Sequence, residues 1–597
     1  MDAVIRSARG RDLWSVLGLI ALAVGLPAVI GIASGAISVP HNDDFAYRRP
    51  ALALYETGRL ELTGWAVMTL VGQLAATMPL LSLAGGSPWA FAATTAVFAV
   101  IGIVASYSLA RRLLPPGLAG FAVLLAILVP GFLIYTTAYM TEIPAFAMEM
   151  SCLAIGAAAL DRSPEEGRWR WLVASLVVGC YAFSIREYAI AAPVAVLVSA
   201  AASDRQGRKL PYAVATVAVI AVCAAIYALT NELPGQGGVG LKAPTAETTR
   251  RVLDAVGLVA FAVSPALAVA VTRWAPYWWR SHHRLEAVLG AVTGAVIVTI
   301  LYGERLQVLV GAAPGPSPDF FVGNVFHSHG SLGVGIFAGD RPGLYDEPVW
   351  QLLNNVALLA TFVAFALLGA ALVAERHRLL RVVDIRHCPA PLGSVTGLVA
   401  GFALLFAAGT TAVGLTVILF DRYTWPLVLP LGILLLLRPE TEGGMDPVAG
   451  LPGLPGRTDR GIGLAMATGT LVAVTASTSL ALLLNAAAFD AARWRMGEEA
   501  MRLGFAAETV DAGLEWVGFH ATGLARLTAQ PQVTMTEYAV KFPSFHRCAV
   551  ASSTPLDFPG FTLVLTRPEA YRLLLLAGPT EPMYLYRVAG PGCPPDA

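Results

Sequence analysis

The sequence predicts an all-α polytopic membrane protein of about 13 transmembrane helices, followed by a small C-terminal α+β domain. The first observation is composition: of 597 residues, 56% are apolar and only 13% are charged, against about 25% charged in soluble domains. The second is that the apolar residues fall into separate runs of about 20, the length that crosses a bilayer as a helix. The 40 basic and 40 acidic residues cancel, so the charge balance gives no indication of a nucleic-acid partner.

The apolar runs define the predicted spans and their orientation. They lie at 13–38, 88–110, 118–135, 143–160, 171–185, 188–203, 210–230, 252–272, 286–302, 349–373, 393–418, 424–437 and 462–484. Arginine is concentrated in alternate loops, beginning with Arg6, Arg9 and Arg11 before the first span. Cytoplasmic loops carry such an excess, so we expect a cytoplasmic N-terminus and an extracytoplasmic C-terminal region. The Arg-, Ala- and Gly-rich composition favours a bacterial inner (plasma) membrane.

Two domains are expected, a membrane domain over 1–484 and an extracytoplasmic soluble domain over 485–597. Within the membrane domain, residues 39–87 form a first outer loop that is too apolar to be solvated throughout, so we expect interfacial helices in it. Residues 303–348 form a second long outer loop, rich in Gly and Pro, as binding loops and lids often are.

Cys548 and Cys593 are the two cysteines expected on the outer side. Disulfides form and persist in such oxidising compartments. We therefore predict a Cys548–Cys593 disulfide that closes the C-terminal domain.

The stretch Asn42–Tyr47 (NDDFAY) follows the first span and contains two adjacent carboxylates, Asp43 and Asp44. Ionisable groups at a membrane edge cost free energy and commonly serve a function. A structural alternative is that one of them caps a helix, although capping needs only one carboxylate. The pair is therefore a candidate reaction centre.

Four short motifs follow one another along the chain: Asp43-Asp44-x-x-Tyr47 with the following Leu54–Leu60, then Met140–Pro144, Ser184–Tyr188 and Phe420–Tyr423. Together they resemble the motifs of the glycosyltransferase-C superfamily. They are similar to motifs of bacterial relatives of protein O-mannosyltransferases, lipid A aminoarabinose transferases and arabinofuranosyltransferases. One departure is Asp44, where many members have Glu. The resemblance covers about residues 10–440 and implies a membrane glycosyltransferase with a polyprenyl-phosphate sugar as donor.

The resemblance implies a single, inverting displacement on an extracytoplasmic acceptor hydroxyl carried by a glycan, a lipid or a protein. Asp43 is the expected general base, and Asp44 or Glu142 would orient the acceptor or raise the proton affinity of the base. Arg186 and Arg422 are expected to hold the donor phosphate, because guanidinium groups bind phosphate oxygens in pairs.

Each arginine also has an acidic neighbour in the sequence. Simple ion pairs of Arg186 with Glu187 and of Arg422 with Asp421 are therefore the structural alternative to phosphate binding.

The remaining candidates are substrate-binding residues: Tyr47, Tyr188, Tyr423, His327 and His329. Two histidines two positions apart in a loop are a poor metal signature, so no metal site and no cofactor are predicted. A requirement for a divalent metal is left as an alternative. A transporter, or a flippase or ligase of lipid-linked glycans, is the alternative function. A transporter would place ionisable residues near the middle of its spans.

Overall fold

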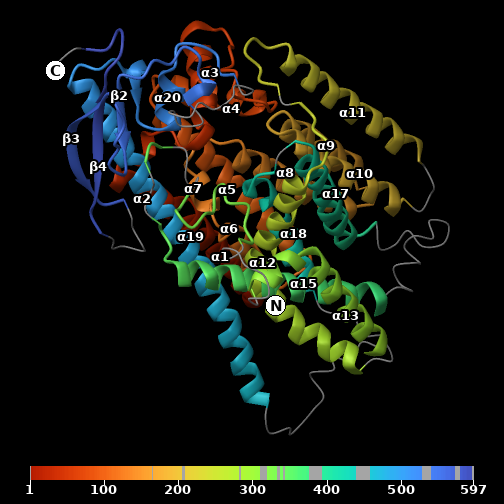
Figure 1. Ribbon diagram of the computed structural model, residues 1–597. Coiled ribbons are helices and arrows are strands. Elements are labelled where there is room, and N and C mark those ends of the chain that lie inside the picture. The colour runs from red at the N-terminus through yellow and green to blue at the C-terminus, as the bar shows by residue number, and fades with distance from the viewer. Residues whose placement is uncertain are drawn as a thin grey trace.

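In the computed structural model, the chain is a bundle of helices with a small sheet at one end (Figure 1). The structure describes residues 2–594 apart from 164–165, 205–208, 239, 281–283, 310–318, 332–336, 340–342, 375–392, 418, 438–456, 527–538 and 572–578. Parts of the predicted outer loop 303–348 and of the C-terminal region therefore lie outside the described residues.

The helices follow the apolar runs of the sequence. The first half contains α1 Asp2–Ile20, a π-helical turn Ala21–Gly25, α2 Leu26–Ser34, α3 Phe45–Thr57, α4 Val71–Leu83, α5 Trp89–Arg111, α6 Pro116–Ile127, α7 Phe132–Tyr135, α8 Glu142–Leu160, α9 Arg168–Phe183, α10 Ala191–Ser203 and α11 Leu210–Asn231. The second half contains α12 Ala246–Arg280, α13 Arg284–Leu301, α14 Gly303–Leu309, α15 Glu347–Ala374, α17 Val395–Thr416, α18 Val428–Leu436, α19 Arg457–Arg502 and α20 Leu514–His520.

Nine helices in the described part of the chain are long and apolar enough to cross a membrane. The other four predicted spans coincide with shorter helices, namely α6, α9, α10 and α18. The span 118–135 is interrupted because Gly131 adopts φ 93°, a conformation that favours glycine. A Cβ there would lie 2.3 Å from a Val325 side-chain atom, so this break also makes room for the outer loop.

Residues 39–87, the predicted first outer loop, contain the helices α3 and α4; their place at the membrane interface stays a prediction. α3 ends at Gly58, which has φ 70° and donates its N–H to the carbonyl oxygen of Leu54. At the other end of α3, Asp44 occupies the N-cap position but makes no side-chain capping hydrogen bond. The capping alternative for the acidic pair is therefore not what the structure contains.

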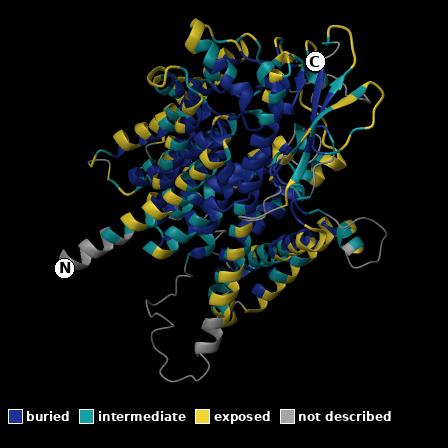
Figure 2. Cartoon of the chain, turned by 90° about the vertical axis from the view of Figure 1, so that its left-hand side faces the viewer, coloured by how far each residue is buried: buried dark blue, intermediate teal, exposed yellow. Residues whose placement is uncertain are grey.

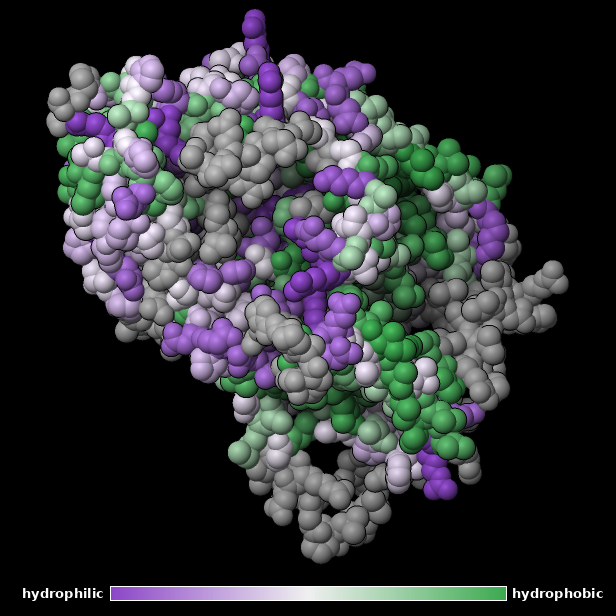
Figure 3. Space-filling view, in the orientation of Figure 1, coloured by the Kyte–Doolittle hydropathy of each residue, from purple (hydrophilic) through white to green (hydrophobic). Residues whose placement is uncertain are grey.

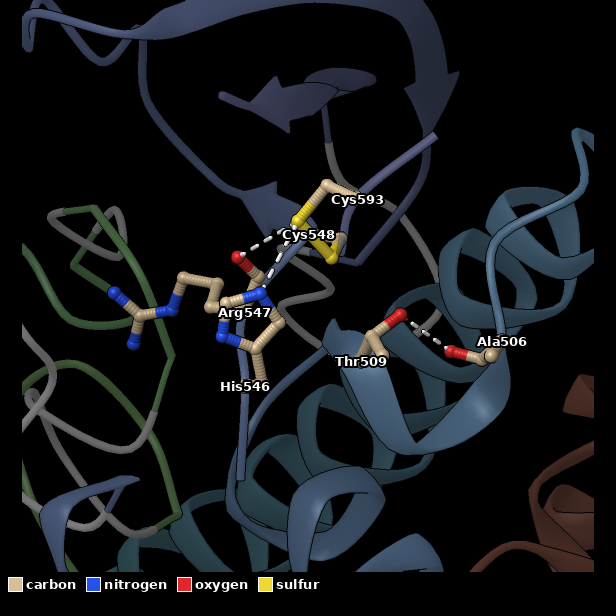
Figure 4. The surroundings of a disulfide bond; sticks show 6 residues. All are labelled: Ala506, Thr509, His546, Arg547, Cys548 and Cys593. Carbon is tan, nitrogen blue, oxygen red and sulfur yellow. Dashed lines mark hydrogen bonds between the residues drawn. A yellow bond between two sulfur atoms is a disulfide. The ribbon is translucent and has the colours of Figure 1, made fainter. Parts of the chain in front are cut away.

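The C-terminal region has a four-stranded sheet in the order β1-β2-β4-β3. Its strands are β1 Val510–Asp511, β2 Ala549–Ser552, β3 Phe561–Glu569 and β4 Glu581–Val588. β1 and β2 are parallel, whereas β2 with β4 and β4 with β3 are antiparallel. The predicted disulfide Cys548–Cys593 is present and closes the region at the start of β2 (Figure 4).

α19 runs through the expected domain boundary at 484/485 without a break, from the lower end of the molecule to the sheet (Figure 1). Its last turns form a second core with the sheet, in which Phe489 and Met496 pack near Leu585. By contrast, Val517 and Phe542 of the C-terminal region belong to the main core of the membrane domain. The C-terminal region is thus joined to the membrane domain by a continuous helix and by shared packing.

Polarity is divided over the surface accordingly. Hydrophilic side chains gather at the upper end and across the middle of the face in Figure 3, whereas apolar ones cover much of its right side and the area below. Several candidate spans are exposed along much of their length, as in Figure 2; α11 has only 17% of its apolar window buried. Such surfaces suit contact with lipid tails.

Candidate active site

Four charged side chains from distant parts of the chain meet in one place. Arg422 Nη2 lies 2.8 Å from Asp43 Oδ2, and Arg422 Nε lies 2.9 Å from Glu142 Oε1. The same Glu142 oxygen lies 2.5 Å from Arg186 Nη2. We call Asp43, Glu142, Arg186 and Arg422 the charged cluster.

Each member of the charged cluster stands at the edge of a helix. Asp43 lies in a short 3₁₀ turn that leads into α3, and Glu142 begins α8. Arg186 precedes the 3₁₀ turn before α10, and Arg422 lies in the 3₁₀ turn before α18. The ends of four helical segments therefore hold the cluster.

The charged cluster is buried except at one edge. The side chains of Arg422, Arg186 and Glu142 are 3%, 5% and 1% exposed, whereas that of Asp43 is 15% exposed. Two positive and two negative groups offset one another, which a buried cluster requires. Asp43 is the carboxylate of the cluster that an incoming molecule reaches first.

Neutral polar groups complete the cluster, and none of them is among the predicted site residues. Trp65 Nε1 donates to Asp43 Oδ1 at 2.9 Å, and Arg186 Nε donates to Thr141 Oγ1 at 2.6 Å. Arg422 Nη1 donates to Asn324 Oδ1 at 3.3 Å. Trp65 and Thr141 lie in stretches already singled out, the apolar part of the first outer loop and the second motif, but no spacing rule pointed to either side chain.

The guanidinium groups of the two arginines pair with distant carboxylates and not with the acidic neighbours in the sequence. Asp421 accepts the backbone N–H groups of Val325 and Phe326 at 2.6 and 2.8 Å, and so ties the outer loop to the turn that carries Arg422. Arg186 pairs with Glu142 instead of Glu187. The ion-pair alternatives of the sequence analysis are therefore replaced by contacts that join distant segments.

Asp44 points to a different set of groups. Its Oδ2 lies 2.8 Å from Arg48 Nη2, one helical turn later, and also accepts the backbone N–H of Tyr139 at 3.4 Å. Asp44 is fully buried. Burial raises the pKa of its carboxyl, and the charges of Arg48 and His41 partly counteract this. These contacts fit a structural role. Among the described residues they do not include the charged cluster, and the part of Asp44 in catalysis stays a prediction.

The three predicted tyrosines surround the charged cluster. The Arg186 guanidinium carbon lies 4.9 Å from the ring centre of Tyr423 and 5.7 Å from that of Tyr188. Tyr47 is buried, and burial is the main cause that raises the pKa of its phenol; the charge of Arg186 lowers this pKa and that of Asp43 raises it. Aromatic faces of this kind stabilise a cation, so Tyr188 and Tyr423 help to hold Arg186 in place.

The predicted histidines lie side by side in the outer loop. The ring centres of His327 and His329 are 5.2 Å apart, and that of His327 is 6.3 Å from Trp350. The links from this loop to the charged cluster run through Asn324 and Asp421. Substrate binding by the histidines stays a prediction.

Potential metal ligands gather near the disulfide. Within the described residues, the group of three such side chains is His546, Cys548 and Cys593. The two sulfurs are bonded to each other, and His546 Nε2 lies 3.5 Å from Cys593 Sγ (Figure 4). A disulfide offers no thiolate to a metal, so this group is structural.

An apolar groove of about 540 Å³ lies among α12, α15, α17 and α18. It is lined along its length by side chains such as Val263, Leu267 and Phe365. Its lining also includes Leu419 and Thr424. Leu419 precedes the 3₁₀ turn that carries Arg422, and Thr424 lies within that turn. The groove therefore runs from the membrane-spanning helices to the segment of the charged cluster.

The fold and the charged cluster define a multi-pass membrane protein with an enzyme-like centre at the ends of its helices. Residues 72–228 match the protein family described as dolichyl-phosphate-mannose-protein mannosyltransferase. Over that part of the chain, the match confirms the expected resemblance to membrane glycosyltransferases and the enzyme class that it implies. The activity of the whole chain is a proposal, because the match spans about a quarter of it.

Solved structures give distant similarities. One is the ArnT of Cupriavidus metallidurans bound to undecaprenyl phosphate, with 14% identity and a TM-score of 0.37 over 89% of this chain and 85% of that one. Another is the archaeal oligosaccharyltransferase AglB of Archaeoglobus fulgidus in complex with an inhibitory peptide and a dolichol-phosphate, with 11% identity and a TM-score of 0.42 over 88% and 69%. Similarities of this size support no inference about substrate. No curated protein matches the sequence.

Proposed function

We propose that the protein transfers a sugar from a polyprenyl-phosphate donor to an acceptor hydroxyl on the outer side of a bacterial inner membrane. The observation that carries this proposal is the charged cluster: two arginines and two carboxylates, brought together from four segments, beside an apolar groove that runs among membrane-spanning helices. A lipid-linked sugar phosphate has the two matching parts, an anionic head and a long apolar tail.

The arginines have the chemistry to hold the phosphate. Arg422 Nη1 is bound by the neutral amide oxygen of Asn324 at 3.3 Å, a weak hydrogen bond that a phosphate oxygen would replace with a charge-assisted one. Arg186 is oriented by Thr141 and by the two tyrosine rings. As the bond between the anomeric carbon and the phosphate oxygen breaks, negative charge grows on the phosphate, and both guanidinium groups offset it.

Asp43 is the proposed general base. It takes the proton of the acceptor hydroxyl while that oxygen attacks the anomeric carbon, and the polyprenyl phosphate leaves from the opposite face, so the configuration inverts. Two features favour Asp43 over the other acids: its side chain is 15% exposed, and Trp65 and Arg422 fix both of its oxygens. Glu142 is enclosed between the two arginines, so its proposed role is to hold them in position.

The proposed orientation places the charged cluster and the C-terminal region outside the cytoplasm. The Cys548–Cys593 disulfide supports it, because disulfides are rare in reducing compartments. Loops rich in arginine on the opposite side support it as well.

The test is a donor panel. Full-length protein in detergent or nanodiscs is incubated with polyprenyl phosphates that carry different sugars, and release of polyprenyl phosphate is measured with added sugar, lipid and peptide acceptors. Release with at least one donor is the expected result. No release with any donor, together with movement of a lipid-linked sugar across proteoliposomes, would instead favour the transport or flippase alternative.

A further inference from the structure

A second group of buried charged residues connects the C-terminal region to the 3₁₀ turn Asn42–Asp44, which we call the acidic turn. Asp490 Oδ2 lies 2.7 Å from His41 Nδ1, and Asp490 also pairs with Arg493, one turn later in α19. Arg493 Nη1 lies 2.6 Å from Glu515 Oε2 in α20. We call His41, Asp490, Arg493 and Glu515 the outer network.

The outer network ends on the backbone of the acidic turn. Glu515 Oε1 accepts the N–H of Asn42 at 3.1 Å, and the side chain of Asn42 donates to the hydroxyl of Tyr135 at 2.8 Å. Asn42 adopts φ 55°, a left-handed conformation that asparagine tolerates better than most residues but that still needs support from its surroundings. Asn42 is thus held on two sides, immediately before Asp43.

A second contact from the C-terminal region reaches the same acid. The ring of Phe542 stacks on that of Trp65, with ring centres 5.5 Å apart and an interplanar angle of 4°. Trp65 in turn donates its indole N–H to Asp43. One path through the backbone of Asn42 and one through the side chain of Trp65 therefore converge on Asp43.

Buried ion networks are costly to desolvate and are weak evidence for stability. Glu515 and Arg493 are 1% and 2% exposed, so their desolvation is nearly complete. The Glu515–Arg493 pair is better explained by the geometry that it imposes on the acidic turn, in which Asn42 has a left-handed conformation.

We propose that Glu515, held by Arg493, is a positioning residue for the general base: it fixes the Asn42 peptide and thereby aims the Asp43 carboxylate at the acceptor hydroxyl. This inference rests on the proposed function. It gives the C-terminal region a part in the reaction although that region supplies no reacting group. A displacement of a reacting group by about 1 Å can cost a factor of about 100 in rate.

The experiment compares four variants of the full chain. Glu515→Ala removes both contacts, Glu515→Asp withdraws the carboxylate from Asn42 while keeping its charge, and Glu515→Gln keeps an oxygen that can accept the N–H of Asn42. Glu569→Ala is the matched control, since Glu569 forms an ion pair with Arg495 of the same helix α19 at 2.5 Å without touching the acidic turn.

Two quantities are measured: kcat and KM for the donor, and hydrogen exchange of peptides that cover Asn42. We expect Glu515→Ala to lower kcat by about 10- to 100-fold with KM changed less than about twofold, and to speed exchange at Asn42. Glu515→Gln should recover most of kcat, Glu515→Asp should recover less, and Glu569→Ala should leave both quantities near wild type. Should the alanine variant not fold, the contrast between Asp and Gln decides.

The outcomes separate this inference from the proposed function. An active wild type whose kcat and Asn42 exchange do not respond to Glu515→Ala would overturn the positioning role alone. Equal losses of kcat in Glu515→Ala and Glu569→Ala, in proportion to thermal stability, would also overturn it. A wild type that releases no lipid phosphate from any donor would overturn the proposed function and, with it, the positioning role of Glu515.

Discussion

Arg422 contacts both carboxylates of the charged cluster and also Asn324, so its replacement by alanine is the most informative perturbation. The change removes the contact with Asp43 at 2.8 Å and that with Glu142 at 2.9 Å. Breaking a buried ion pair costs about 3 to 5 kcal/mol. The lower end applies here, because Glu142 keeps Arg186 and the partly exposed Asp43 keeps Trp65 and gains water. We therefore expect a loss of stability of about 3 kcal/mol.

We expect Arg422→Ala to lose more activity than its lower stability explains, even when the variant is folded. Removing one preorganised donor to a developing negative charge costs about 100- to 1,000-fold in kcat. Arg422→Lys keeps a charge, but one ammonium cannot reproduce the spread of guanidinium contacts, so we expect an intermediate rate with a smaller loss of stability.

The assay follows release of polyprenyl phosphate at saturating donor, together with the thermal unfolding midpoint in the same detergent. If folded Arg422→Ala retained its rate within about threefold, equivalent to less than about 1 kcal/mol in the barrier, Arg422 would not stabilise the leaving phosphate. Should Arg422→Ala not fold, the rate of Arg422→Lys is compared with that of wild type instead. A lysine variant as slow as the alanine variant would assign the effect to geometry more than to charge.

Three further changes have distinct expected outcomes. Glu142→Gln should lower turnover at least about tenfold, because it releases both arginines. Glu149→Gln, two turns along the same face of α8, is the control and should have little effect, because the Glu149 carboxylate oxygens have no hydrogen-bond partner among the described residues. The two turnover rates, measured side by side, check this. Burial lowers the pKa of His41, but Asp490 outweighs burial and raises the pKa above its ordinary value. The stability that protonated His41 contributes is therefore complete below about pH 6.5 and is lost as the pH rises through the raised pKa. His41→Gln should lower the unfolding midpoint more at pH 5.5 than at pH 9, and equal shifts at the two pH values would contradict this. Reduction of the Cys548–Cys593 disulfide, which joins residues 45 apart, should cost about 2 to 4 kcal/mol, seen as a lower midpoint that the double serine variant reproduces without reductant.

Much of the fold could be predicted from the sequence, because apolar length and turn residues are local signals. Each predicted span coincides with a helix, and Gly58, a residue type that commonly ends helices, ends α3. The continuity of α19 across residue 484 differs from the expected boundary, which coincides with the end of the apolar run. The amphipathic pattern of 487–503 follows it with no Gly or Pro between, so a continuous helix was within reach.

The candidate site was predicted in part. Four of the predicted residues meet in the charged cluster. The alternative to phosphate binding placed the partners of the two arginines among their sequence neighbours. Arg422 instead contacts Asp43, 379 positions away, and local spacing contains no information about such a pairing. The same holds for Glu515, which is 473 positions from Asn42, and for the separation of Asp43 from Asp44, which depends on the direction in which each side chain leaves a short 3₁₀ turn.

The measurement that tests the central claim most directly is single-turnover release of polyprenyl phosphate by wild type, Asp43→Asn and the control Glu56→Gln, an exposed carboxylate on the same segment. With a general base removed, we predict a rate at least about 100-fold lower for Asp43→Asn, donor binding within about threefold of wild type, and an unchanged rate for Glu56→Gln. A folded Asp43→Asn protein that releases lipid phosphate as fast as wild type would contradict the assignment of this charged cluster as the reaction centre.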